Sequence, residues 1–138
     1  MKKFKIMMLL CALIFSVSFI HAKDINVVIF LTKKENYKSA LKQANGLSKS
    51  IVNNKENGDI ELVLGGSAVE IFTDKNNELR NEVINLSQKP HVRILVCNGA
   101  LNARKLDKSI IPENIKVINA APREVVDRQL EGYAILNP

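Results

Sequence analysis

The chain has 138 residues and a formal net charge of +6, and 46% of its residues are hydrophobic. This length suits one hydrophobic core, and the composition is that of a globular rather than a disordered chain. Aromatic residues are only 5% with no Trp, which argues against the stacking platforms of single-stranded nucleic-acid or glycan binding, and two Cys (Cys11 and Cys97) are too few for a disulfide framework or a four-ligand zinc site.

The first 22 residues have the organisation of a secretory signal peptide. Three of the first five residues are lysines, an uncharged apolar run follows over 6–20, and the small residue Ala22 stands at its exit. This run is shorter than the ~20 apolar residues that span a bilayer. Cleavage after Ala22 is therefore favoured over an uncleaved anchor. We expect one mature domain over 23–138, periplasmic or secreted, with no stable membrane anchor.

Cleavage changes the charge and leaves few nucleophilic groups. Removing three of the 20 basic residues and none of the 14 acidic ones leaves a net charge of +3, which gives no argument for nucleic-acid binding. One thiol, Cys97, and one imidazole, His91, remain. An unpaired Cys in an exported protein suggests pairing with a thiol of another molecule or a reactive thiol.

Beyond the predicted cleavage site, apolar runs alternate with amphipathic segments. The near-continuous apolar run 25–31 is typical of a strand buried on both faces, and apolar residues spaced by three and four over 37–51 predict a helix. Further strands are predicted at 60–64, 92–96, 115–118 and 133–136, and further helical segments at 67–72, 79–86, 100–106 and 122–130. This alternation implies right-handed crossovers and an α/β fold, with a mainly parallel sheet of about five strands and helices on both faces.

The remaining thiol lies where such a sheet places its functional sites, beyond the carboxyl ends of the strands. Cys97 ends the third predicted strand, and Asn98 or Gly99 lies near the cap of the helical segment that follows it. Helix N-termini and nearby cations favour the nucleophilic thiolate, and Lys33 or Lys34 would supply a cation if the first and third strands are neighbours. The alternative is that Cys97 is a small buried hydrophobe that closes the strand.

Two other features near the strand ends have a functional and a structural interpretation. Gly65, Gly66 and Ser67 follow the second strand and would form either an anion-binding nest or a tight turn, of which the turn is favoured because paired Gly is chiefly a turn signal. His91 begins the strand that Cys97 ends, so the two lie about 20 Å apart. This separation excludes a Cys/His catalytic pair or metal site within one chain and predicts a surface position for His91. The sequence calls for no metal or cofactor.

Three segments resemble the DsrE/DsrF-like (YchN-like) family, and the likeness covers nearly all of residues 25–138. They are the strands with their following residues at 27–32, 60–66 and 92–101. The resemblance implies a sheet of about five strands and assembly as a homo-oligomer, a trimer or hexamer. Members of the sulfur-relay branch carry a persulfide on a Cys after a central strand, and Cys97 occupies the matching position.

These observations lead to two main hypotheses of function. In the first, the protein is an exported, oligomeric family member in which Cys97 handles sulfur in exchange with a thiol or persulfide partner protein. Residues at the neighbouring strand ends would then bind the ligand: Lys33, Gly65, Gly66, Ser67, Asn98 and Gly99. In the second, the protein is a non-catalytic oligomeric module that binds a small ligand or a protein, and Cys97 only packs. A self-contained active site is the weakest alternative, since one Cys and one distant His leave few catalytic groups.

Overall fold

The computed structural model describes residues 24–138, so the predicted signal peptide and its cleavage site lie outside the described residues. These residues form one five-stranded sheet in the order β4-β3-β2-β1-β5, in which every neighbouring pair is parallel. The strands are β1 (Ile25–Leu31), β2 (Gly58–Leu64), β3 (Val92–Cys97), β4 (Lys116–Ile118) and β5 (Ala134–Leu136). The predicted fold class is confirmed.

Helical segments connect the strands, as the alternating pattern predicted. The α-helices are α2 (Tyr37–Asn54), α3 (Glu78–Leu86), α4 (Asn98–Ala103) and α5 (Ala121–Leu130), and the 3-10 turns are η1 (Lys34–Asn36), η2 (Gly66–Phe72) and η3 (Lys108–Ile110). In residues 24–138 no helix combines the length and the apolar character that a membrane crossing requires.

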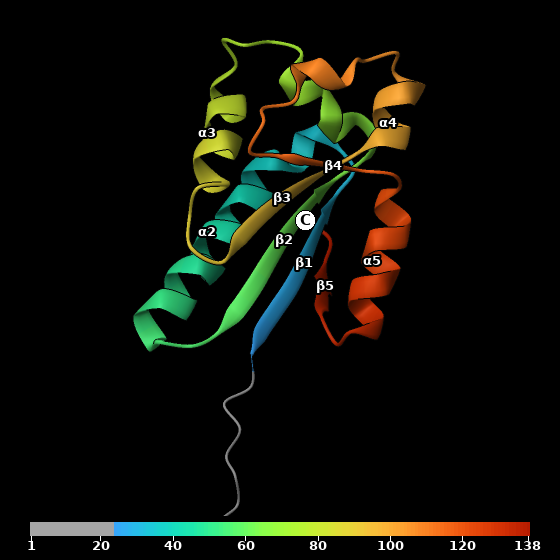
Figure 1. The fold of residues 1–138 in the computed structure, drawn as a ribbon. Coiled ribbons are helices and arrows are strands. Elements are labelled where there is room, and N and C mark those ends of the chain that lie inside the picture. Colours follow the sequence, from blue (N-terminus) through green and yellow to red (C-terminus); the bar gives the residue numbers. More distant parts are fainter. Residues whose placement is uncertain (1–23) are drawn as a thin grey trace, which may run out of the picture.

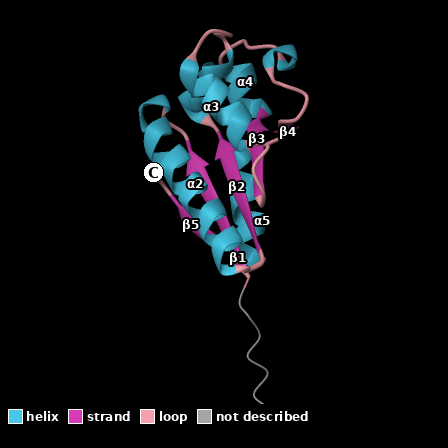
Figure 2. Cartoon of the chain, turned by 90° about the vertical axis from the view of Figure 1, so that its left-hand side faces the viewer, coloured by secondary structure: helices cyan, strands magenta, loops and turns pink. Residues whose placement is uncertain are grey.

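The order of the strands decides which face each helix covers. From β1 to β4 the chain advances across the sheet in one direction, and α5 then returns it past β1 to β5. Because parallel crossovers are right-handed, connections that run in opposite directions lie on opposite faces. Accordingly, α2 and α3 cover one face of the sheet and α5 covers the other (Figure 1), and Figure 2 shows α2 in front of the strands.

This reversal sends the connections that follow the neighbouring strands β3 and β4 to opposite faces of the sheet. The connection that follows β3 passes the side of α3, where the amide of Asn114 donates a hydrogen bond to Ser87 Oγ. The connection that follows β4 enters α5 on the opposite face. In open α/β sheets, ligands bind at such a divergence.

The two faces of the sheet differ in chemistry. On the side of α2, the buried helix residues Ala40, Ala44 and Ile51 follow the three- and four-residue spacing seen in the sequence, and β2 presents fully buried Ile60, Leu62 and Leu64. On the side of α5, β2 carries Asp59 and Glu61 at the alternate positions, and β3 carries Arg93 beside Glu61. The first face is an apolar core, whereas the second includes charges.

The turn after β2 requires a glycine. Gly66 has a φ of +49°, and a Cβ there would lie 2.3 Å from the carbonyl oxygen of Thr32. Gly46 lies within α2, and a Cβ there would meet no atom within 4 Å. The two glycines therefore form a matched pair for substitution.

We predict that Gly66→Ala destabilises the protein by about 1–3 kcal/mol, because Ala strains the left-handed backbone and contacts Thr32. The control Gly46→Ala should instead stabilise it by about 0.5–1 kcal/mol, because Ala is favoured over Gly in a helix interior. Urea unfolding of both variants measures the difference. Equal stability of the two variants would show that the turn after β2 tolerates a side chain.

Candidate functional site

Cys97 ends β3, is paired with Ile118 of β4, and contacts the beginning of α5. It directly precedes α4, has an extended backbone (φ −73°, ψ 115°) and is 7% exposed. The backbone N–H of Ala121, the first residue of α5, donates a hydrogen bond to Cys97 Sγ across 3.3 Å. The thiol therefore lies near the N-termini of both α4 and α5.

Gly65 and Gly99 lie beside the sulfur and the first turn of α5. A Cβ on Gly99 would lie 3.6 Å from Cys97 Sγ and a Cβ on Gly65 would lie 3.6 Å from the Cβ of Ala121, which are ordinary contact distances. The Gly99 N–H also donates to the carbonyl of Asn119 across 3.3 Å, which joins α4 to the end of β4. Of the residues singled out in the sequence, Gly65, Asn98 and Gly99 thus gather with Cys97 around the start of α5.

The remaining predicted ligand residues lie in a separate turn. Lys33 or Lys34 is expected beside the thiol only if the first and third strands are neighbours. β2 separates β1 from β3, so this condition is not met. Two strand spacings amount to about 10 Å. Lys33 is exposed, and the ammonium of Lys34 lies 3.3 Å from Glu70 instead.

The amides after β2 are bonded within this turn. The Gly65 N–H donates to the carbonyl of Leu31, and the Ser67 N–H donates to that of Thr32, each across 2.9 Å. Ser67 Oγ accepts from the backbone N–H of Lys34 across 3.1 Å. These bonds, together with the positive φ of Gly66, favour the tight turn over the anion-binding nest.

His91 lies at the other end of β3 from Cys97, as predicted. It directly precedes the strand, is exposed, and its Nδ1 lies 2.9 Å from the carbonyl oxygen of Gly58. The predicted surface position is confirmed. Among the described residues 24–138, no three His, Cys, Asp or Glu side chains are grouped so that they could hold a metal ion.

A cavity of about 380 Å³ lies beside the end of β4 and the start of α5. It offers two cationic side chains, one carboxylate and one amide, and it is lined by Lys116, Val117, Ile118, Asn119, Ala120, Arg123 and Glu124. These residues lie on both sides of Ala121 along the chain, and the Ala121 N–H contacts the thiol. The sequence predicted a strand over 115–118, but it gave no sign that the β4–α5 junction covers Cys97.

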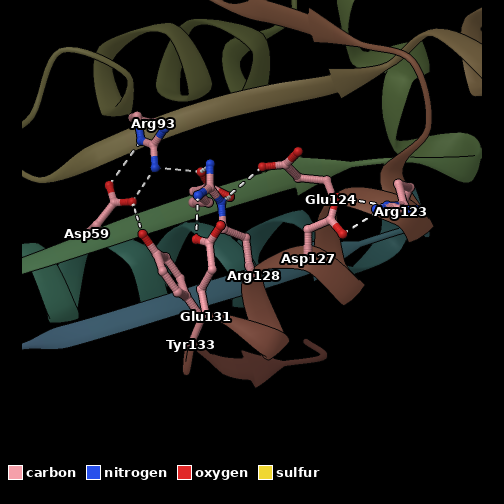
Figure 3. Close-up of polar contacts among 9 residues, drawn as sticks. Asp59, Arg93, Arg123, Glu124, Asp127, Arg128, Glu131 and Tyr133 are labelled. Carbon is pink, nitrogen blue, oxygen red and sulfur yellow. Dashed lines mark hydrogen bonds and ion pairs between the residues drawn. The ribbon is translucent and has the colours of Figure 1, made fainter.

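A second feature that sequence reasoning missed is a charged network between α5 and the sheet (Figure 3). Its centre is Glu61, whose side chain is fully buried on β2. Glu61 Oε1 lies 2.6 Å from Nη2 of Arg93 and 2.9 Å from Nη2 of Arg128, and Oε2 accepts from Arg128 Nε across 3.0 Å. The lone Glu within the apolar strand 60–64 was the available signal.

Burial and the two neighbouring arginines act in opposite directions on the pKa of Glu61. Burial raises the pKa of Glu61 above its ordinary value, although the hydrogen bond from Arg128 and the positive charges of Arg93 and Arg128 oppose that shift. An ionised Glu61 is therefore costly to bury and depends on both guanidinium groups.

Further contacts extend the network from Glu61 along α5 and to the residue before β5. Arg128 also bonds Glu124 across 3.0 Å and Glu131 across 2.8 Å. Asp59 accepts hydrogen bonds from Arg93 and from the hydroxyl of Tyr133 (Figure 3). Burial and the bond to Asp59 raise the pKa of Tyr133 to about 12, so it remains a donor at neutral pH. These contacts join α5 and the residue before β5 to β2 and β3.

The fold and the position of the thiol define an α/β protein with a Cys at the end of a central parallel strand. Residues 26–138 match the model of the DsrE/DsrF-like family, and the chain belongs to that family. No curated protein matches it.

Two solved structures show the same fold. One is the protein of unknown function MTH1491 from Methanobacterium thermoautotrophicum, with a TM-score of 0.70 and 24% identity over 83% of this chain and 100% of that one. The other is the ychN protein from E. coli, with a TM-score of 0.59 and 15% identity over 84% of this chain and 100% of that one.

Proposed function

We propose that this DsrE/DsrF-like protein is a sulfur carrier that holds one sulfur atom on Cys97. The observation that carries the proposal is the place of the thiol, at the carboxyl end of β3 with its sulfur 3.3 Å from the Ala121 N–H at the start of α5. That N–H supports a negative charge on sulfur, which both a thiolate nucleophile and a persulfide anion carry. Membership of the family adds support.

The proposed step moves one sulfur atom from a donor persulfide to the Cys97 thiolate and needs no separate oxidant. The Cys97 thiolate attacks the outer sulfur of a persulfide on a donor protein or small thiol. A bond forms between Cys97 Sγ and that sulfur, and the donor's S–S bond breaks with its electron pair on the donor sulfur. The products are a Cys97 persulfide and the donor thiolate, so sulfur moves with no net oxidation or reduction.

The second candidate function is a non-catalytic oligomeric module that binds a small ligand or a protein, in which Cys97 serves packing. Its support is the 7% exposure of Cys97, since a buried free Cys behaves as a small hydrophobe. The cavity at the β4–α5 junction would then serve as the ligand site, with Lys116 and Arg123 favouring an anion. The two functions differ in whether Cys97 reacts in the folded protein.

The proposal places the carrier outside the cytoplasm, in the periplasm or secreted. Its support is the charged start, the short apolar run and Ala22 at the exit of that run. An exported carrier with a single thiol needs a partner protein that donates or accepts the sulfur, because it cannot close a disulfide with itself.

We also propose that the protein is a homo-oligomer that buries the outer face of α5. Two of the large apolar side chains most exposed on the described residues are Val126 at 51% and Leu130 at 82%, and with Pro122 they are spaced by four residues along α5. An exposed apolar stripe of this kind is typical of an association surface. Arg123 near one end of α5 and Glu131 after the other would pair if two copies met with the helices antiparallel.

The export proposal predicts a mature protein that begins at Lys23. N-terminal sequencing of the protein from the producing cell should give that start, since the short apolar run favours cleavage over retention. Recovery of the full chain in the membrane fraction would contradict cleavage and restore the anchor.

The assembly proposal predicts a multiple of the monomer mass at micromolar concentration, measured by light scattering. Leu130→Lys should shift the population toward monomer, because it places a charge in the apolar stripe. The control Gln129→Lys adds the same charge at the adjacent exposed residue and should leave the mass unchanged. A monomer in the unaltered protein would refute the proposal.

The carrier proposal predicts that incubation with a persulfide donor adds the mass of one sulfur atom to the peptide that contains Cys97. Treatment with a dithiol reductant should remove the added atom, because persulfides are reducible. Cys97→Ser is the matched control and should gain nothing at this peptide. If the folded protein takes up no sulfur while the unfolded chain does, the packing role is the correct one.

A further inference from the structure

The first turn of α5 covers Cys97, and the apolar contacts of this helix are few. Of its ten residues only Ala121 is buried, and Val125 is half-buried. The opposite face of the helix carries the exposed Val126 and Leu130. The buried contacts of α5 outside its first turn are therefore mainly polar, and they centre on Arg128.

We infer that the ion pair between Glu61 and Arg128 fixes α5 over Cys97, which makes Arg128 a positioning residue for the thiol. Arg128 Nε donates a hydrogen bond to Oε2 of the buried Glu61 carboxylate across 3.0 Å, and Arg128 Nη2 forms an ion pair with Oε1 at 2.9 Å. At the other end of the same helix, the Ala121 N–H contacts the sulfur. A reactant reaches Sγ when α5 moves away, and this pair sets how often that happens.

The inference follows from a comparison of the surroundings of Glu61 when α5 covers it and when α5 has moved away. With α5 in place, Glu61 is shielded from water and Arg128 compensates its charge. When α5 moves away, Glu61 loses Arg128 but gains water. Without Arg128, the closed position would leave a buried carboxylate with only Arg93, and opening would relieve it by hydration. Removing Arg128 should therefore favour the open position.

The charge state of Glu61 should modulate this effect. The charged and titratable groups that face it are Arg93 from β3, Asp59 from its own strand, Arg128 and Glu124 from α5, and Glu131 and Tyr133 from the segment after α5. From β1, the paired residue is the apolar Val28. A protonated Glu61 needs no counter-charge, so the loss of Arg128 should matter most above the pKa of Glu61, which burial raises.

The experiment compares the iodoacetamide labelling of Cys97 in three variants of the full chain, read from the mass of the Cys97 peptide. Arg128→Met removes the partner of Glu61. Arg128→Met with Glu61→Gln removes the charge that needs a partner. Asp127→Asn is the matched control, because it breaks the ion pair with Arg123 on the same helix, which does not involve Glu61. Each rate is divided by that of the unaltered protein at the same pH, so that the titration of the thiol cancels.

At pH 8 we expect Arg128→Met to label about tenfold faster or more, because a buried charge has lost its partner. Asp127→Asn should stay within about twofold, as for exposed ion pairs. The double variant should return most of the way to the unaltered rate. The acceleration in Arg128→Met should shrink as the pH falls and Glu61 takes up a proton.

Three results would overturn the inference. The first is an Arg128→Met rate no higher than that of the Asp127→Asn control. The second is a double variant that labels as fast as Arg128→Met. The third is an acceleration that rises with low urea concentrations in step with global unfolding, because opening of α5 alone exposes little surface and depends weakly on urea. The inference rests on the proposed function only for the biological role of moving α5. The labelling experiment needs no sulfur transfer, so the inference and the proposed function can fail separately.

Discussion

The burial of one carboxylate on the second strand governs how the C-terminal part of the chain is arranged. Glu61 is fully buried in the middle of the sheet, and an ionised group there is stable only with counter-charges close by. Arg93 comes from the neighbouring strand, but Arg128 reaches Glu61 only if α5 lies on this face of the sheet. The return of the chain from β4 to β5 supplies that helix, so topology and charge require the same arrangement.

The same return also produces the thiol site. Because β5 pairs with β1 rather than with β4, the helix before it must cross to the face that α2 and α3 leave open. Its first residue then lies at the ends of β2 and β3, beside Gly65 and Cys97. The contact between the Ala121 N–H and Cys97 Sγ is thus a consequence of strand order.

Most of the fold could be predicted from the sequence, whereas only part of the site could. Apolar runs and helical spacing are local patterns, and they predicted the strands and helices to within a few residues. The start of α4, for example, is at Asn98 rather than near residue 100. Cys97 was found because strand ends are readable. Strand order is a non-local property, so the separation of Lys33 from Cys97 and the pairing of Glu61 with Arg128, 67 residues apart, were not readable.

The two candidate functions share the position of α5 over Cys97 and differ in whether α5 moves away from the thiol. The N–H that would stabilise a thiolate or persulfide on Cys97 belongs to the residue that covers the sulfur. A helix held permanently would leave Cys97 as a packing residue, and a helix absent from the site would remove the donor that supports the charge. A sulfur carrier therefore needs α5 to be held firmly but reversibly. An ion pair around a costly buried carboxylate provides such a hold, since opening lets water replace the lost partner.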